Sequence, residues 1–394
     1  MAKYKFSQRS IRIPDSGIGY ISQYASKHKD VISLGQGTPL FPTPSFIYDE
    51  LYKRSKTDKT LGMYSGPAIW NELKSLIVKQ MKDLYGFTPE FNQLDLTIGG
   101  IGGLFAVFMA LLEKGDEVIF FDPSYPLHLS QIHLTQAKAV FVPYNEKLKW
   151  KIDLDKFEKA ITKKTRVVVL TNPNNPTGTV LSKDEVKELA RIVLKHNLIL
   201  VLDEAYDFLV YEKELFSPLR LPSLRKNIVV CKSFSKEFAM TDWRIGYVWA
   251  DKEIMAKIHD IHLHFSVNAV TPSIAAAIAA LKDNRGRKAT EGFIQKFTES
   301  RKAICERLDR LPKLFSYYQP EGAYYTFPKY LHFKVDSFKF AEMLVDEAKV
   351  VTIPGSSAGP RGEEHIRMSF AADKSVIHRA FDRIDKLAKK HDLV

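Results

Sequence analysis

The chain has 394 residues, of which 45% are hydrophobic and 26% are charged, and its formal net charge is +12 at pH 7. This length allows two domains around a large buried core, and the composition is ordinary for a soluble globular protein. The charge does not predict a nucleic-acid partner, because lysines are interleaved with acids, as in Lys183–Glu185, and no nucleic-acid motif occurs. We instead expect a basic surface that aids solubility and attracts anionic substrates.

The apolar runs and the cysteines give an expectation about the setting of the protein. The longest apolar stretches, Gly103–Leu112 and Ile274–Leu281, are too short to span a bilayer, and the first residues lack the apolar core of a signal peptide. The two cysteines, Cys231 and Cys305, have no metal-binding spacing. We therefore expect no membrane partner and a reducing, cytoplasmic setting.

The predicted elements alternate, in chain order, between short apolar runs and amphipathic helical segments. Such alternation is typical of βαβ units and predicts an α/β fold with a mainly parallel sheet flanked by helices. A helix is expected over Gly103–Leu112, and another begins at a capping box formed by Ser182 and Glu185. The predicted strands are Leu94–Ile98, Val118–Phe121, Val167–Leu170, Leu198–Leu202, Ile228–Val230 and Ile245–Trp249.

The pattern changes after about Leu281. The polar stretch Lys282–Thr290 is expected to precede a long charged helix, followed by short strands and a C-terminal helix that ends near Lys389. We therefore predict a large domain over residues 46–281 and a smaller α+β domain over residues 282–394. The N-terminal arm, residues 1–45, is expected to join the small domain.

Polar clusters follow several predicted strands, at the edge where open α/β sheets bind ligands. The glycine-rich turn Thr97–Gly103 could bring backbone N–H groups and a helix N-terminus to an anion, although its spacing also fits a plain turn. The segment Asn172–Gly178 is rich in turn-forming residues, yet an Asn side chain there can donate a hydrogen bond to a phenolate-like oxygen.

The next two clusters carry charged side chains. Asp203 ends an apolar run, so its carboxylate needs a cationic partner or a hydrogen-bond donor. This could be a structural salt bridge or a protonated ring nitrogen. The segment Ser233–Gly246 contains Lys236, which could be an ordinary surface lysine. Arg244 lies beside an apolar run and is expected to need an anion.

Taken together, the motifs resemble those of the class I/II aminotransferases of pyridoxal 5'-phosphate (PLP) fold type I, the aspartate aminotransferase-like superfamily. The patterns S-x-S-K-x(7)-R-x-G, N-x(2)-N-P-T-G and D-E-x-Y occur here in that order and spacing. The similarity runs from about Ile32 to Phe370. It implies a seven-stranded, mainly parallel sheet and a small domain built from both termini.

The resemblance also implies roles for the residues of the site. Lys236 would carry PLP as a Schiff base and then move the proton between the substrate Cα and the cofactor, while Asp203 would keep the pyridine nitrogen protonated. Tyr206 and Asn175 would donate hydrogen bonds to the ring oxygen. The implied phosphate contacts are Ser233, Arg244 and the backbone of Gly99, Gly100 and Ile101.

Further matches concern the cofactor ring, the substrate and the assembly. The resemblance implies that Tyr125 stacks on the cofactor and that Tyr64 reaches the phosphate of a neighbouring subunit, which makes an obligate homodimer with shared active sites. Either tyrosine could instead belong to the core. Arg367 would clamp the substrate α-carboxylate, with Asn175 beside it. Gly37 would contribute a backbone contact from an arm that closes as a lid.

Three positions depart from the family pattern. Ala358 stands where an aromatic residue is usual, so a roomier substrate pocket is expected there. Gly100 or Ile101 often carries a hydroxyl, so one phosphate contact is expected from the backbone alone. Asp242 replaces a more usual glycine, and the sequence offers no physical reason for it.

Three histidines, His259, His262 and His264, lie close together in the sequence, the first two at i,i+3 spacing. No third ligand occurs at a convincing spacing, so we predict solvated or pocket-edge histidines and no metal.

The reaction is expected to be transamination, with an amino acid of the aspartate or aromatic type as donor and a 2-oxo acid such as 2-oxoglutarate as acceptor. A second reading is another fold type I PLP enzyme, such as a C–S β-lyase or a cyclopropane-carboxylate synthase. A third is a regulator that carries a helix-turn-helix module ahead of the PLP domain, for which the similarity from Ile32 leaves no room.

Overall fold

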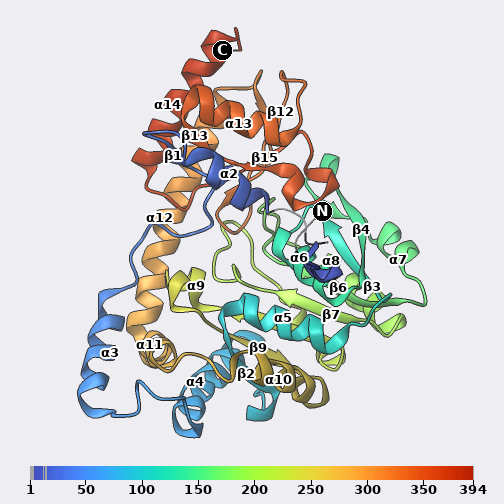
Figure 1. Ribbon diagram of the computed structural model, residues 1–394, viewed down its shortest axis with the longest axis vertical. Coiled ribbons are helices and arrows are strands. Elements are labelled where there is room, and N and C mark those ends of the chain that lie inside the picture. The colour runs from blue at the N-terminus through green and yellow to red at the C-terminus, as the bar shows by residue number, and fades with distance from the viewer. Residues whose placement is uncertain (1–3, 12, 14–15, 394) are drawn as a thin grey trace.

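The computed structural model describes residues 4–11, 13 and 16–393. Residues 1–3, 12, 14, 15 and 394, which fall within the predicted arm and small domain, lie outside the described residues. The chain forms two layers, a large sheet with its helices and a second layer that contains the C-terminal third of the chain (Figure 1). Among the described residues, no helix has the length and apolar character needed to cross a membrane.

The large sheet confirms the predicted mainly parallel α/β architecture. Neighbouring strands from β8 through β7, β6 and β3 to β4 are parallel, whereas β9 runs antiparallel to both β8 and β2. The strands lie in the order β2 (Leu94–Ile98), β9 (Ile245–Ala250), β8 (Ile228–Ser233), β7 (Ile199–Asp203), β6 (Thr165–Thr171), β3 (Glu117–Asp122), β4 (Lys138–Asn145) and β5 (Lys151–Ile152).

The predicted count of seven strands was wrong by one, because β5 adds a short eighth strand antiparallel to β4. Strand β5 contains only two residues and therefore has no apolar run that marks it in the sequence. Each of the six strands predicted by position is present, with ends that differ by a few residues at most.

Alternating side chains of the sheet enter two separate cores. Val229 and Cys231 of β8 pack toward one face, whereas Ile228 and Val230 pack toward the other. The first face is covered by α5 (Gly99–Leu111), α6 (Pro126–Thr135) and α10 (Lys252–Ser266). The second is covered by α3 (Ser45–Thr57), α4 (Pro67–Tyr85), α7 (Leu154–Ala160), α8 (Lys183–Lys195) and α11 (Thr271–Lys282).

Helix α5 begins four residues earlier than predicted, at Gly99. Glycine disfavours helix interiors, which hid this first turn in the sequence. Close packing explains the glycines, because a Cβ on Gly103 would lie 2.6 Å from Val248 and one on Gly100 would lie 3.3 Å from the Ser233 Cβ. The N-terminus of α5 therefore lies tightly against the ends of β8 and β9.

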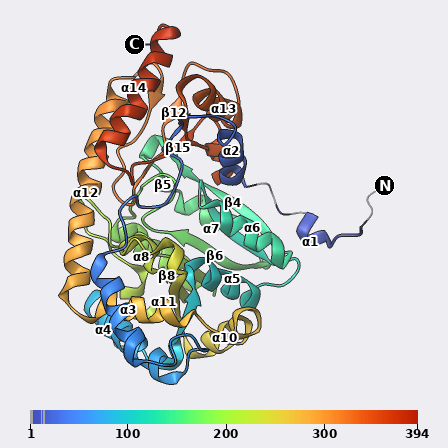
Figure 2. The ribbon, with the colours of Figure 1, turned by 60° about the vertical axis from the view of Figure 1, so that its left-hand side comes forward.

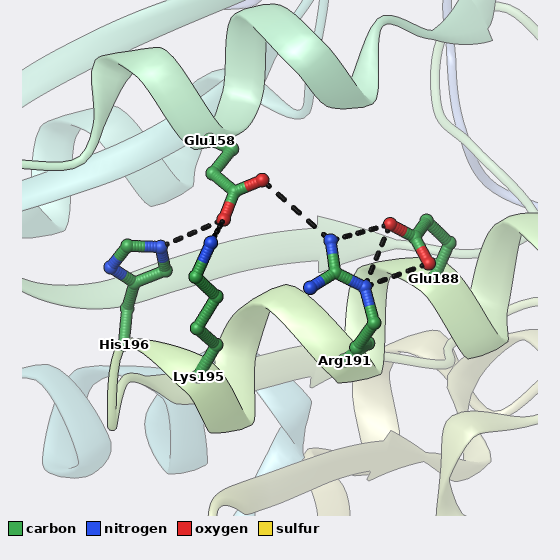
Figure 3. Close-up of polar contacts among 5 residues, drawn as sticks. All are labelled: Glu158, Glu188, Arg191, Lys195 and His196. Carbon is green, nitrogen blue, oxygen red and sulfur yellow. Dashed lines mark hydrogen bonds and ion pairs between the residues drawn. The ribbon is translucent and has the colours of Figure 1, made fainter.

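The capping box predicted for α8 is confirmed. Ser182 Oγ accepts a hydrogen bond from the Glu185 backbone at 3.3 Å, and the Glu185 carboxylate accepts one from the Ser182 backbone at 2.9 Å. The far end of α8 is joined to α7 at the surface, where Glu158 accepts hydrogen bonds from Lys195 at 2.7 Å and His196 at 3.0 Å (Figure 3).

The second layer packs three helices around six short strands. Helix α12 runs along one side of the molecule, from the large sheet layer into this second layer (Figure 2). The helices are α12 (Asn284–Asp309), α13 (Ser337–Ala348) and α14 (Lys374–Lys390). The strands are β10 (Phe315–Ser316), β11 (Tyr325–Thr326), β12 (Lys329–Tyr330), β13 (Val350–Val351), β14 (Ile353–Pro354) and β15 (Ile366–Ser369).

The polar stretch expected to precede α12 is in fact its first part, so that prediction was wrong. Asp283 caps the helix by accepting a hydrogen bond from the Arg285 backbone at 2.9 Å. Gly286 allows the helix to pass the Ala280 carbonyl, with which a Cβ at this position would collide. The polar composition gave no sign of this part of the helix, because its start depends on the Asp283 cap and on the close packing of Gly286 against the Ala280 carbonyl.

The N-terminal segment packs on the second layer. Strand β1 (Ile32–Ser33) pairs with β13 in parallel, and α2 (Gly17–Ala25) packs on α13 through Ile21 and Ala25. These contacts agree with an arm that joins the C-terminal part of the chain. The boundaries at residues 45 and 281 stay predictions.

Candidate active site

A cavity of about 410 Å³ lies at the carboxyl ends of the parallel strands, between the two layers. Asp203 ends β7, Ser233 ends β8, and Lys236 follows in α9 (Phe234–Glu237), while Arg367 enters from β15 of the second layer. The predicted site residues that line the cavity are Gly37, Gly100, Ile101, Tyr125, Asn175, Asp203, Tyr206, Ser233, Lys236, Arg244 and Arg367. Segments far apart in the sequence are thus brought to one place.

The Asp203 carboxylate is held by two partners. Its Oδ2 lies 3.0 Å from Nε2 of His128, a residue that is fully buried, and its Oδ1 accepts a hydrogen bond from the Ala205 backbone at 3.1 Å. The partner expected for this carboxylate therefore exists within the chain as a histidine. Asp203 also lines the cavity, so the same carboxylate can accept a hydrogen bond from a protonated group of a bound molecule.

The Lys236 amine points to the backbone of the N-terminal segment. Its Nζ donates a hydrogen bond to the Gly37 carbonyl at 2.6 Å. Burial lowers the pKa of Lys236, and the Arg367 and Arg244 guanidiniums lower it further against the effect of Asp203, to about 8. With this pKa, roughly one tenth of the lysine is a neutral, nucleophilic amine at pH 7, and about half is neutral near pH 8.

One end of the cavity is suited to an anion. Gly99 is the first residue of α5, and a Cβ there would lie 2.5 Å from Nη2 of Arg244, so only glycine lets the guanidinium approach the helix N-terminus this closely. Arg244 itself has a positive φ of 50° and donates to the Thr241 carbonyl at 2.7 Å. With the Ser233 hydroxyl beside them, these groups form a cradle for a phosphate.

Arg367 forms a second anion site and is only 4% exposed. Its Nη2 donates to the Gly35 carbonyl at 2.8 Å and its Nη1 donates to Asn175 Oδ1 at 3.1 Å. Its guanidinium also lies over the Tyr325 ring, 4.6 Å from the ring centre. The Arg367 Nε is buried without a hydrogen-bond partner among the described residues, which leaves a donor for a carboxylate.

Two predicted tyrosines lie at the cavity wall. The Tyr206 hydroxyl is 2.8 Å from the Tyr325 hydroxyl. Burial, and to a lesser extent this neighbour, raises the pKa of Tyr206 well above its usual value. Tyr125 meets the His128 ring edge to face, with centres 5.2 Å apart, and burial raises its pKa to about 12. Both phenols therefore stay protonated and can serve as hydrogen-bond donors.

Tyr64 is the predicted site residue that the structure places away from the cavity. Its side chain is 81% exposed, beside Met63, which is 64% exposed. Gly99 does not line the cavity surface either, although it packs directly against Arg244.

The departures predicted from the family pattern have different outcomes. The Ala358 carbonyl accepts a hydrogen bond from the Ser124 backbone at 2.8 Å. A second cavity of about 390 Å³ is lined by its neighbours Ser357 and Gly359 and shares Leu127 with the first cavity. Ala358 lines neither cavity, so the roomier substrate pocket stays a prediction. Asp242 is exposed, and nothing in the structure explains it.

The histidine cluster on α10 is explained by Asp95 of β2. The carboxylate of Asp95 lies 3.2 Å from Nδ1 of His259 and 2.8 Å from Nδ1 of His262. Despite burial, these two hydrogen bonds hold the pKa of Asp95 at about 2. The prediction of solvated or pocket-edge histidines was wrong for His262, which is 2% exposed. The described residues contain no group of three or more side chains placed to hold a metal ion.

Sequence reasoning missed several residues of the site. His128 and Tyr325 contact the predicted residues Asp203 and Tyr206, and the Gly35 carbonyl holds Arg367. The need of a buried Asp203 for a partner was visible in the sequence, but it did not indicate which residue would meet it. Leu104 and Leu127 also line the cavity and carry no chemical signal.

The comparisons with known proteins agree with this geometry. Residues 29–384 match the family model of the aminotransferases of class I and II. The chain is 35% identical to an aspartate aminotransferase of Pyrococcus horikoshii over 98% of this chain and 97% of that protein. It is 31% identical to an aromatic-amino-acid aminotransferase of Thermococcus litoralis, over 98% of this chain and 99% of that protein.

A solved structure gives the same result in three dimensions. The aromatic aminotransferase from Pyrococcus horikoshii superimposes with a TM-score of 0.88 and 32% sequence identity, covering 95% of this chain and 100% of that one. The chain belongs to the class I and II aminotransferases, a family that typically uses PLP.

Proposed function

We propose that this aminotransferase holds PLP on Lys236 and moves an amino group from an L-amino acid to a 2-oxo acid. The observation that carries the proposal is the position of Lys236, whose amine has a pKa lowered to about 8 in a cavity that also contains Asp203, Arg244 and Arg367. One nucleophilic amine, one carboxylate and two separate anion sites match what this chemistry requires.

The donor groups of the cavity fit PLP. The cradle of Arg244, Ser233 and the α5 N-terminus, which Gly99 keeps open, suits the dianionic phosphate. Asp203 suits the pyridine nitrogen, and Tyr206 together with the Asn175 amide would donate hydrogen bonds to the ring oxygen. The stacking position beside the ring would belong to Tyr125.

Bound PLP supplies an electron sink that stabilises the negative charge left when a substrate loses its Cα proton. Asp203 would keep the ring nitrogen protonated, and His128 would hold that carboxylate in place through the 3.0 Å contact. Lys236 would take the proton from the substrate Cα with its neutral amine and return it at the cofactor carbon. The phenol of Tyr206 would orient the ring.

The substrate α-carboxylate would be bound by Arg367, whose Nε still has a free donor position, and by the backbone at Gly37. Two relatives, one named for aspartate and one for aromatic amino acids, support a donor of one of these types. The acceptor would be a 2-oxo acid such as 2-oxoglutarate, which enters the same cavity in the second half of the cycle.

We also propose a homodimer in which Tyr64 reaches the phosphate of the neighbouring subunit. Its support is an exposed apolar surface around this tyrosine, where Met63, Val267 and Val270 are 64%, 51% and 46% exposed. The Thr271 hydroxyl donates to the Met63 carbonyl at 2.7 Å, so the two segments are neighbours. An obligate partner would cover this surface.

The test is a panel of donors with 2-oxoglutarate. Purified protein reconstituted with PLP is given L-aspartate, L-phenylalanine, L-tyrosine, L-methionine, L-alanine or L-cystathionine, which carries a Cβ–S bond, and the oxo acid, glutamate, ammonia and thiol are quantified. Transamination predicts oxo acid and glutamate in equal amounts. Release of ammonia or of a thiol without glutamate would replace this proposal with the C–S β-lyase reading, and no turnover of any amino acid would favour the regulator.

The matched control in this assay is Arg367→Gln. We expect its KM for the preferred donor to rise about 10- to 100-fold, because a charge-assisted hydrogen bond contributes roughly 1.5–3 kcal/mol. PLP retention should stay as in the unmodified protein, since Arg367 lies at the other anion site. An unchanged KM would remove Arg367 from the substrate site.

A further inference from the structure

A group of ionisable side chains lies on the opposite face of the sheet from the phosphate cradle. Side chains alternate along β8, so Cys231 packs toward α5 while Val230 packs toward α4. Ser233 therefore faces the cradle, and Lys232 extends to the other side, where its ammonium meets the end of α4 at Tyr85.

Lys232 is the cation of this group, and its side chain is only 8% exposed. Its Nζ forms an ion pair with Asp207 Oδ2, donates to the Tyr85 hydroxyl at 3.1 Å and lies 3.7 Å from Glu204 Oε2. The Tyr85 hydroxyl in turn donates to Glu204 Oε2 at 2.7 Å. One ammonium thus serves two carboxylates.

The charged residues of this group lie at the ends of β7 and β8, next to the segments whose side chains line the cavity. Glu204 and Asp207 belong to the turn after β7, which also contains Tyr206, whereas Lys232 directly precedes Ser233 on β8. The backbone ladder between these strands ends at Asp203 and Cys231, followed by one bond from the Glu204 backbone to the Cys231 carbonyl at 3.2 Å. Beyond this bond, the Lys232–Asp207 ion pair also joins the two segments.

Stability alone does not explain this arrangement. A buried ion pair gains little over a well-packed apolar pair, because desolvation offsets most of the attraction. Glu204 Oε1 and the Tyr247 hydroxyl are buried without hydrogen-bond partners among the described residues, so the group also leaves polar atoms unsatisfied. What the pair does provide is a directional contact between the two turns.

We propose that Lys232 and Asp207 form a positioning pair that holds the Tyr206 turn at a fixed distance from the segment carrying Ser233 and Lys236. The charged groups of the pair face away from the phosphate cradle, so the pair would act through the neighbouring residues of the cavity. This inference rests on the proposed PLP function. Lys232 itself lines the cavity, but its ammonium meets its partners on the far face of the sheet. The proposal assigns to this ion pair the spacing between the carboxylate and phenol of one turn and the amine of the other.

The experiment compares Lys232→Met, Asp207→Leu and the double variant, each as holoenzyme. The rate of PLP release on dilution, the thermal midpoint, and kcat and KM for one donor are measured. Each single variant leaves buried charges without their partner, so we expect a lower thermal midpoint. We expect PLP release to accelerate about 10- to 100-fold, as when groups that orient metal ligands are removed.

The double variant separates positioning from stability. Two apolar side chains can pack in place of the ion pair. Glu204 loses the nearby ammonium as well, but it keeps the Tyr85 hydroxyl as a donor, and burial raises its pKa, which favours its neutral form. The thermal midpoint of the double variant should therefore return toward that of the unmodified protein. PLP release should stay accelerated and kcat should stay low, because the directional contact is lost. If the double variant restores both the midpoint and PLP retention, the pair is only structural and the proposal is overturned.

Arg307→Met is the matched control. The Arg307 side chain is also 8% exposed and faces two carboxylates, Asp382 at 2.7 Å and Asp385 at 2.8 Å, but it joins α12 to α14 away from the cavity. It should lower the thermal midpoint without changing PLP release. Equal acceleration in this control would show general loosening and would also overturn the proposal.

Failure of this proposal can be distinguished from failure of the proposed function. If the unmodified protein retains PLP and catalyses transamination while all variants release PLP at its rate, only the positioning pair is lost. If the unmodified protein itself fails to bind PLP, the proposed function fails first.

Discussion

Two lysines four residues apart lie on opposite sides of the end of β8 and have opposite acid–base properties. Burial by itself would lower the pKa of Lys232, but the Asp207 carboxylate and other acidic neighbours raise it well above its usual value. Burial lowers the pKa of Lys236, and two guanidiniums lower it further, to about 8. The charges around a buried amine, more than burial itself, decide whether it serves as an ammonium or as a nucleophile.

The surface network in Figure 3 shows what the same residue types do in solvent. Hydrogen bonds from Lys195 and then His196 lower the pKa of Glu158 to about 2, although this carboxylate lies at the surface between α7 and α8. Arg191 also contacts Glu158, at 3.6 Å, and is bound by Glu188. Such exposed pairs are screened by water and salt, so a large pKa shift there carries no functional meaning.

Replacing the nucleophilic lysine should have the largest effect. Lys236→Ala removes the amine that moves the Cα proton, so kcat is expected to fall about 10²- to 10⁴-fold. Lys232 should not substitute for it, because its ammonium is held by carboxylates. The measurement is oxo acid release in steady state, with retained PLP quantified in parallel. Activity near that of the unmodified protein would show that turnover does not need the Lys236 amine and would contradict the different roles given to the two lysines.

Asp203→Asn tests the carboxylate that faces the cavity. The amide keeps the size of the side chain but removes the negative charge that would stabilise a protonated ring nitrogen, so we expect kcat to fall about 10²- to 10³-fold. The contact with His128 should survive as a neutral hydrogen bond. Rapid-mixing measurements of the first half-reaction isolate this step, and an unchanged rate there would exclude a role for Asp203 in it.

The difference in pKa between Lys236 and Lys232 predicts how chemical labelling of the two lysines in the cofactor-free protein depends on pH. Below a pH of about 8, the reactivity of Lys236 toward an amine-specific acylating reagent should fall about tenfold per pH unit, because the neutral amine is the nucleophile. Peptide mapping should show Lys232 unmodified throughout this range. Equal labelling of both lysines would contradict the assigned environments.

The lowered pKa of Lys236 also predicts the direction in which the free energy of unfolding changes with pH. Between about pH 8 and its ordinary value of 10.5, Lys236 is deprotonated in the folded chain and still protonated in the unfolded chain. The unfolded state binds more protons there, so the contribution of Lys236 to the free energy of unfolding rises with pH. Lys236→Met should flatten this part of the profile, as measured by denaturant unfolding of the cofactor-free protein.

The smallest effect is expected at the surface network. Glu158→Gln removes the carboxylate that Lys195 and His196 share, yet its partners remain solvated. Turnover and PLP release should be unchanged, and the thermal midpoint nearly so. A loss of activity comparable to that of the Lys232 variants would contradict the view that the buried Lys232–Asp207 pair affects function and the exposed Glu158 network does not.

The sequence alone predicted the residues that carry charge or special backbone geometry at the strand ends. Lys236, Asp203 and Arg244 were found because they follow apolar runs and belong to spaced motifs. Arg367 was implied by the resemblance to the aminotransferase family, and the four residues meet in one cavity. The strands were found because a buried parallel sheet requires continuous apolar runs.

What the sequence could not predict depends on contacts between distant segments. His128 reaches Asp203 across 75 positions and Tyr325 reaches Tyr206 across 119. The positioning pair of Lys232 and Asp207 was also hidden, because a lysine before a serine gives no sign that it turns to the far face of the sheet. The early start of α12 depended on one cap and one glycine contact.

The most direct test of the account identifies the lysine that binds the cofactor. The protein is loaded with PLP and reduced with borohydride, which converts a lysine–PLP linkage into a stable secondary amine, and its peptides are then examined by mass spectrometry. We predict that the added mass lies on Lys236 alone and disappears in Lys236→Ala. Added mass on Lys232 or another lysine, or none on any lysine, would contradict the central claim.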